Sequence, residues 1–150
     1  MEPRIESALL GVLTLVISEK YPDYPCYTGK PPFGQYGDID VSLICLEGTA
    51  GDLIHLLSAA ELKYPKLVAQ EAKLLLSAQS EILELHRKYF ENKWKGTAGE
   101  LMHTLKLENC SIFDDETIEL WYAGGHAFRQ LYVHLNLDSE MRLSEVGFDG

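Results

Sequence analysis

The stretch "IELWYAGGHAFRQLYVHLNLD", Ile118–Asp138, decides the fold of this chain. Apolar and polar residues alternate on both sides of a Gly-Gly pair, which is the period-two pattern of half-buried strands. Glycine tolerates the positive φ angles of tight hairpin turns, so Gly124-Gly125 predicts a turn between two antiparallel strands. We therefore expect a β-hairpin here rather than a catalytic loop. The residues predicted to share a face are Ile118, Leu120 and Tyr122 on the first strand and Val133, Leu135 and Leu137 on the second.

Further strand patterns surround this hairpin and extend it to a four-strand meander. The predicted strands are residues 110–115, 116–122, 127–138 and 141–150. On the third of them, Tyr132, His134 and Asn136 would occupy the polar face.

Helical spacing dominates the middle of the chain. Thr49 and Asp52 form a possible capping box for a helix that Pro65 should end, because proline lacks the backbone N–H that a helix interior needs. A second helix is predicted over residues 67–92, and a third, short one after the capping-box pair Thr97 and Glu100. The apolar stripes expected in the core are Leu53, Leu56, Leu57 and Ala60, then Val68, Ala72, Leu75, Ala78, Ile82, Leu85 and Tyr89.

The N-terminal section is predicted to be β-structure. Leu9–Ser18 is rich in β-branched residues and leucine, and Ile39, Val41, Leu43 and Cys45 alternate with polar residues. The Pro- and Tyr-rich residues 21–37 between them predict a turn-rich loop or a distorted edge hairpin. Residues 1–150 are thus expected to form a single α+β domain. It would pack an antiparallel sheet, made of the N-terminal strands and the C-terminal meander, against two to three central helices.

The charge balance narrows the classes of partner. Thirteen Lys and Arg against 23 Asp and Glu give a net charge of −10. Such a chain repels the phosphates of nucleic acids and of anionic membrane surfaces, and it attracts basic proteins. No run of about 18 apolar residues is present to span a bilayer. We expect a protein partner, with neither nucleic acid nor membrane involved.

Cysteine usage points to a reducing compartment. The chain has three cysteines, far apart and without a CxxC pair, which favours reduced thiols in the cytoplasm. Residues 1–4 lack the basic character of a signal peptide, which agrees with that location. Cys45 and Cys110 are predicted to be small buried hydrophobic residues, and Cys26, among prolines and tyrosines, to be an exposed thiol.

Sequence motifs for catalysis are missing. His126 and His134 have no third metal ligand at a familiar spacing, and the sequence holds no phosphate-binding glycine motif and no nucleophile elbow. His55 and His86, each alone on a helix, are expected to face solvent or the polar edge of the core. We predict no catalytic residues, no metal and no cofactor.

The candidate partner-binding residues combine tyrosine rings with carboxylates. Tyrosines crowd the Pro-rich segment, and amphipathic rings with an acidic fringe suit a protein interface. The rings could instead cover the open side of the sheet or serve a homodimer, and the acidic groups could be turn formers. The candidates are Tyr24, Tyr27, Asp38 and Asp40, with Asp114, Asp115 and Glu116 as a second patch.

Several segments together resemble an uncharacterised bacterial family, a domain of unknown function of the kind found among small immunity-like proteins. The segments are Leu10-Gly11-Val12-Leu13, "IDVSL", "KYFENKW", "LMHTLKLENCSIFDDETIELWY", and the closing series Gly125, Phe128, Val133, Leu135, Asp138 and "VGFDG". The chain departs from the pattern at Gln130-Leu131, where the family tends to have Gly-His after the Phe. Any chemical role of that pair would be lost here.

The resemblance and the charge together favour a non-catalytic, immunity-type inhibitor that neutralises a basic toxin, for example a nuclease, by direct contact. The alternative is a housekeeping scaffold or interaction protein. A third hypothesis is an enzyme whose site assembles only in the fold, from several of His86, His103, His126, His134 and the carboxylates.

Overall fold

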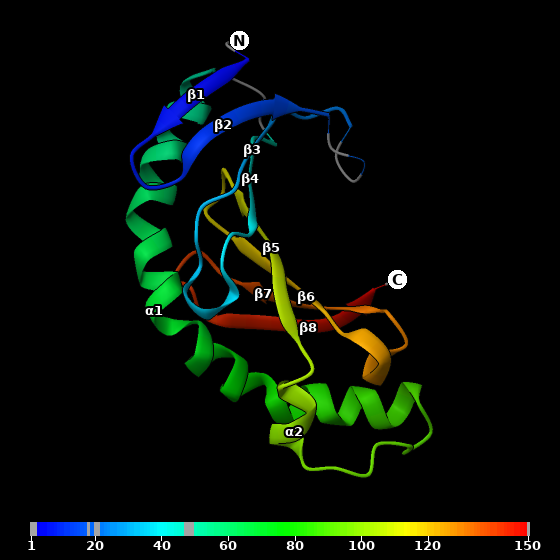
Figure 1. Cartoon of the computed structure of the whole chain (residues 1–150). Helices are drawn as coiled ribbons and strands as arrows, with labels where there is room; N and C mark the ends of the chain where they lie inside the picture. The colour runs from blue at the N-terminus through cyan, green and yellow to red at the C-terminus, as the bar shows by residue number, and fades with distance from the viewer. Residues whose placement is uncertain (1–2, 18, 20–21, 47–49, 150) are drawn as a thin grey trace.

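The computed structural model of the chain describes residues 3–17, 19, 22–46 and 50–149, with the backbone alone for residues 50–52. These residues form an eight-stranded sheet whose strands lie in sequence order (Figure 1), and the predicted α+β class is confirmed. Neighbouring strands are antiparallel except β4 and β5, which are parallel. The strands are β1 (Arg4–Ser7), β2 (Gly11–Val16), β3 (Cys26–Gly29), β4 (Asp40–Ile44), β5 (Lys106–Phe113), β6 (Ile118–Ala123), β7 (Tyr132–Leu137) and β8 (Leu143–Asp149).

The parallel pair requires a long crossover, because strands that run the same way cannot be joined by a hairpin. Helix α1 (Ala50–Tyr89) and the short helix α2 (Ala98–Met102) supply it. Figure 1 shows α1 curving along one side of the sheet, from beside β1 and β2 to the opposite end of the molecule. The predicted capping box of α2 is confirmed, since the Thr97 hydroxyl accepts from the Glu100 N–H and the Glu100 carboxylate accepts from the Thr97 N–H, each at 3.1 Å.

The predicted helix break at Pro65 is wrong, because α1 runs through it without interruption. Proline costs a helix interior a hydrogen bond and crowds the preceding turn, but its ring is tolerated on an exposed face of a curved helix. Pro65 is exposed, while Tyr64 and Leu67 beside it are buried and continue one apolar stripe. Packing on both sides of Pro65 therefore outweighs the local penalty. The predicted N-cap Thr49 lies outside the described residues, as do Ser18, Tyr21 and the side chain of Asp52.

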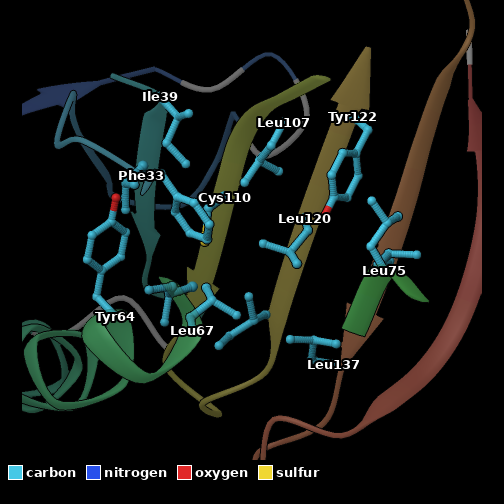
Figure 2. Close-up of a cluster of buried hydrophobic side chains, with 14 of the residues drawn as sticks. Phe33, Ile39, Tyr64, Leu67, Leu75, Leu107, Cys110, Leu120, Tyr122 and Leu137 are labelled. Atoms are coloured by element: carbon cyan, nitrogen blue, oxygen red, sulfur yellow. The ribbon is translucent and has the colours of Figure 1, made fainter. Parts of the chain in front are cut away.

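The hydrophobic core lies between the helices and one face of the sheet. Figure 2 shows side chains of β5 and β6 gathered with Tyr64, Leu67 and Leu75 of α1. The alternations predicted for residues 118–122 and 133–137 are confirmed, since every second residue is buried. At residues 39–45 the predicted apolar residues are buried, but Ser42 and Ile44 on the other face of β4 are buried as well. The core-facing residues in these strands or directly beside them are Ile39, Val41, Leu43, Cys45, Ile118, Leu120, Tyr122, Val133, Leu135 and Leu137.

The stripe predicted for the second half of α1 is correct only in part. Leu75, Ala78 and Ile82 are buried, but Ala72 and Tyr89 are exposed. Two polar residues, Glu71 and His86, are buried instead. The helix therefore points one carboxylate and one imidazole into the core.

The N-terminal predictions need two corrections. The strand predicted at residues 9–18 is present in a shorter form as β2, and the chain makes an unpredicted hairpin before it, in which β1 pairs with β2 and Ser7 lies opposite Gly11. The Pro-rich residues 21–37 are not merely a loop, since they contain β3, an interior strand between β2 and β4. Residues 26–29 carry no proline, so every N–H in this short strand can join a ladder.

The Gly-Gly hairpin is confirmed as a strand pair, but the tight turn is wrong. β6 and β7 pair in register from Ile118–Leu137 to Ala123–Tyr132, and residues 124–131 connect them. This connection holds the 3₁₀ helix η2 (Gly125–Phe128), whose Phe128 is buried in the core. A Cβ at Gly124 would lie 2.5 Å from that of Phe128, so this glycine provides space for the ring. The strand predicted from residue 127 therefore begins only at Tyr132.

Candidate protein-binding face

The second face of the sheet, opposite the core, carries polar and aromatic side chains. On β6, Glu119 and Trp121 alternate with the buried Leu120 and Tyr122, and all four are fixed by the pairing of β6 with β5 and β7. The helices contribute their buried residues to the core on the other face. Over β6 to β8 this second face is half exposed, as expected when only one side of an antiparallel sheet is packed.

An aromatic row crosses β6 and β7 on this face. Trp121 and His134 are cross-strand partners with ring centroids 5.0 Å apart and planes inclined by 33°. Tyr132 also contacts Trp121, with ring centroids 6.2 Å apart and ring planes inclined by 70°. A Cβ at Gly147, the neighbour of His134 on β8, would collide with the imidazole, so glycine leaves space for the ring to lie over β8.

Carboxylates border the aromatic row and fix its polar atoms. Glu119 accepts a hydrogen bond from Trp121 Nε1 at 2.9 Å, and Glu108 accepts one from the Tyr132 hydroxyl at 3.2 Å. Glu108 lies at a β-bulge between Leu107 and Asn109, a type of irregularity that re-aims a side chain. The charge of Glu108 raises the pKa of Tyr132, so this hydroxyl stays a donor.

A second polar chain continues across β7 to β8. His134 Nδ1 and Asn136 Oδ1 lie 3.1 Å apart, and Asn136 Nδ2 donates to Glu145 at 3.4 Å. Because the amide oxygen can only accept, Nδ1 carries the proton in this arrangement. We call the whole surface the aromatic–acidic face, made of Glu108, Glu119, Trp121, Tyr132, His134, Asn136 and Glu145.

This combination suits a cationic side chain. A Lys or Arg placed over an aromatic ring is attracted by the negative face of the ring, and a neighbouring carboxylate adds a charge-assisted hydrogen bond. Tyr132 is 39% exposed, whereas Trp121 and His134 are half-buried, so Tyr132 is the most accessible ring of the row. The face therefore offers both an anchoring ring and carboxylates at its border.

The Tyr-rich part of the predicted site divides between surface and core. Tyr24 is 41% exposed and lines a cleft with Leu15, Ile17 and Pro22. Tyr27 is 0% exposed, so its prediction as a partner contact is wrong. It lies on β3 opposite Leu43 and packs into the core, which leaves no ring surface for a partner.

The two predicted acidic patches lie at opposite ends of the paired strands β4 and β5. Asp40 starts β4 and pairs with Asn109, while Ile44 pairs with Phe113, the residue before Asp114. Since β4 and β5 are parallel, Asp38 and Asp40 sit at one end and residues 114–116 at the other. The structure does not bring them together.

Structural contacts occupy several of these carboxylates. Asp40 forms an ion pair with Lys30 at 2.7 Å. Asp115 accepts from the Thr117 hydroxyl at 2.6 Å, and Glu116 pairs with Lys63 of α1 at 3.2 Å. The Asp115 contact belongs to a turn, and the Glu116 contact joins this turn to α1.

A buried polar triad joins helix and sheet, and sequence reasoning missed it. Glu71 is 3% exposed, and its Oε1 accepts hydrogen bonds from Tyr36 and Tyr122, both at 2.7 Å. Burial and the carboxylate raise the pKa of both tyrosines, which stay protonated donors. The sequence did hold a signal for the burial of Glu71, because it lies four residues from both Leu67 and Leu75 and so shares their face of the helix.

The three cysteines are buried, and the described histidines lie at several different places in the fold. Cys26 is buried with Ile44 and Phe113, so its prediction as an exposed thiol is wrong. Burial raises the pKa of the Cys110 thiol to about 12, which opposes formation of a nucleophilic thiolate. No three His, Cys, Asp or Glu among the described residues come together as metal ligands. His86 and His126 share one cleft, His103 lines another, and His134 lies on the aromatic–acidic face.

Comparisons with protein-family models, curated proteins and solved structures found no match to this chain. Neither helix of the described residues combines the length and the apolarity needed to cross a membrane. The functional argument therefore depends on the site itself.

Proposed function

We propose that this chain is a non-catalytic protein-binding domain that holds a basic protein against its aromatic–acidic face. The observation that carries the proposal is the row of Trp121, Tyr132 and His134 on the open face, bordered by Glu108, Glu119 and Glu145. Aromatic residues are the usual anchors of protein interfaces, and carboxylates beside them select cationic side chains.

The charge of the whole molecule supports a basic partner. A net charge of −10 raises the rate at which a cationic protein meets the chain, and it slows the approach of acidic ones. Rigid strands carry the face, so little conformational entropy is lost on binding compared with a loop.

We further propose that the partner is a toxin and that the chain acts as an immunity-type inhibitor. The support is the resemblance to immunity-like proteins together with the acidic surface. A housekeeping scaffold would use the same face. Deleting a scaffold, however, would not make the cell sensitive to the product of a neighbouring gene.

A growth assay separates these two functions. The gene adjacent to the one for this chain is expressed in a naive host, alone and together with the chain. We expect the neighbour to stop growth and the chain to restore it, whereas Trp121→Ala should restore it less well. If the product of the neighbouring gene is harmless, the proposal that the partner is a toxin is wrong and the scaffold function remains. Rescue by Trp121→Ala at full strength would exclude the aromatic–acidic face.

A further inference from the structure

The C-terminal end of α1 forms a cationic cleft with η2 and Arg129, which belong to the connection between β6 and β7. Its volume is about 210 Å³. Among the described residues that line it, none is Asp or Glu, although acidic residues outnumber basic ones in the chain by 23 to 13. The lining residues are His86, Phe90, Lys93, Trp94, His126, Ala127 and Arg129.

His86 contributes a buried polar atom without a partner. The residue is 2% exposed, and its Nε2 lies 2.5 Å from the carbonyl oxygen of Ala127. A carbonyl only accepts, so Nε2 donates and holds η2 against the helix. Nδ1 is buried and has no hydrogen-bond partner among the described residues. Buried nitrogens of this kind are rare and costly, and they occur at functional sites.

Arg129 is held at the cleft by ring contact and by a strained turn. Its guanidinium lies 5.2 Å from the centre of the Phe90 ring. Arg129 and Gln130 have φ angles of 51° and 66°, a region that favours glycine and strains the backbone of other residues. Hydrogen bonds from Gln130 N to Gly125 O at 2.8 Å and from Arg129 N to His126 O at 3.1 Å close the turn.

The stacked guanidinium keeps its planar N–H donors at the edge of the ring, where an oxyanion can meet two of them at once. Lys93 adds a second permanent positive charge to the lining. Phe90 and Trp94 provide apolar walls. The cleft is smaller than the roughly 300–1,000 Å³ of pockets for drug-sized ligands.

We propose that this cleft binds a phosphate group, either as inorganic phosphate or as a small phosphate monoester. Two permanent cations match a doubly charged anion better than a single carboxylate. The lining of the cleft shares no residue with the aromatic–acidic face, so either proposal can fail without the other.

The two tryptophans of the chain make the test specific. Trp94 lines the cleft, whereas Trp121 lies on the aromatic–acidic face. The full chain, labelled with ¹⁵N, is titrated with inorganic phosphate and then with phenyl phosphate, and the two indole N–H resonances are followed. Trp121→Phe identifies which signal is which.

We expect the Trp94 resonance to move to saturation with at least one of the two ligands, while that of Trp121 stays in place. Saturation by both at similar concentrations indicates recognition of the phosphate alone. Tighter binding of phenyl phosphate indicates a monoester whose apolar group contacts Phe90 or Trp94.

Charge variants supply the control. Arg129→Ala, or Lys93→Ala if the first variant is unfolded, should weaken binding by about tenfold, the worth of one charge-assisted hydrogen-bonding group. Lys73→Ala removes an equal charge from an exposed position of α1 and should leave the affinity unchanged. An immobile Trp94 resonance, or equal weakening by Lys73→Ala, would overturn the proposal.

Discussion

At the scale of single residues, the most consequential one is Glu71. It is a carboxylate inside a hydrophobic core, and two tyrosines from different elements donate to the same oxygen. Burying a charge is costly unless hydrogen bonds compensate for it, and here they also fix α1 over β6 and η1 (Gly34–Tyr36). The triad therefore specifies how the helix sits on the sheet.

Glu71→Leu should lower the free energy of unfolding by about 3 kcal/mol, because it leaves two tyrosine hydroxyls without their acceptor. Urea unfolding followed by circular dichroism measures the loss. Adding Tyr36→Phe and Tyr122→Phe should recover part of it, since no unpaired hydroxyl then remains. Glu81→Leu, at an exposed site of the same helix, is the control, and an equal effect there would contradict the role of the triad.

At the scale of elements, short-range sequence patterns predicted strands and helices correctly where local spacing determines them. They failed where contacts between distant residues determine the structure. The alternation at residues 118–122 and 133–137 was sufficient to predict two strands and their buried faces. β3 was hidden among prolines because its four residues are too few for a period-two pattern. Pro65 predicted a break because a local signal cannot register the burial of Tyr64 and Leu67.

The candidate site follows the same division. The alternation placed His134 on the polar face of its strand, and the structure confirms that position. It could not show that Trp121 stacks on His134, nor that Tyr132 reaches Glu108, because those contacts depend on strand register and on a bulge. Tyr27 was misassigned because composition cannot separate a buried tyrosine from an exposed one.

Pro65→Ala tests how α1 is stabilised. Alanine restores an N–H for the helix and removes the ring from the preceding turn, so the free energy of unfolding should rise by about 1–3 kcal/mol. Thermal and urea unfolding measure the change, with Lys66→Ala at the adjacent exposed position as the control. A decrease would mean that the helix needs a bend at Pro65 to follow the sheet.

At the scale of the whole molecule, the two faces of the sheet have separate tasks. One is covered by α1 and α2 and contains the core, as Figures 1 and 2 show. The other carries the aromatic–acidic face on β5 to β8, in a protein with a net charge of −10. Long-range attraction of a basic partner and short-range anchoring on Trp121 and Tyr132 would act at different distances, and kinetics can separate them.

The most direct test of the central claim is the association rate with the product of the adjacent gene, measured at several salt concentrations. Glu119→Gln with Glu145→Gln removes two charges from the aromatic–acidic face. Glu81→Gln with Glu84→Gln removes two from the exposed side of α1 and serves as the matched control. The account predicts that the face variant associates several-fold more slowly at low salt and with a weaker salt dependence than the helix variant. Equal rates for the two variants would contradict it.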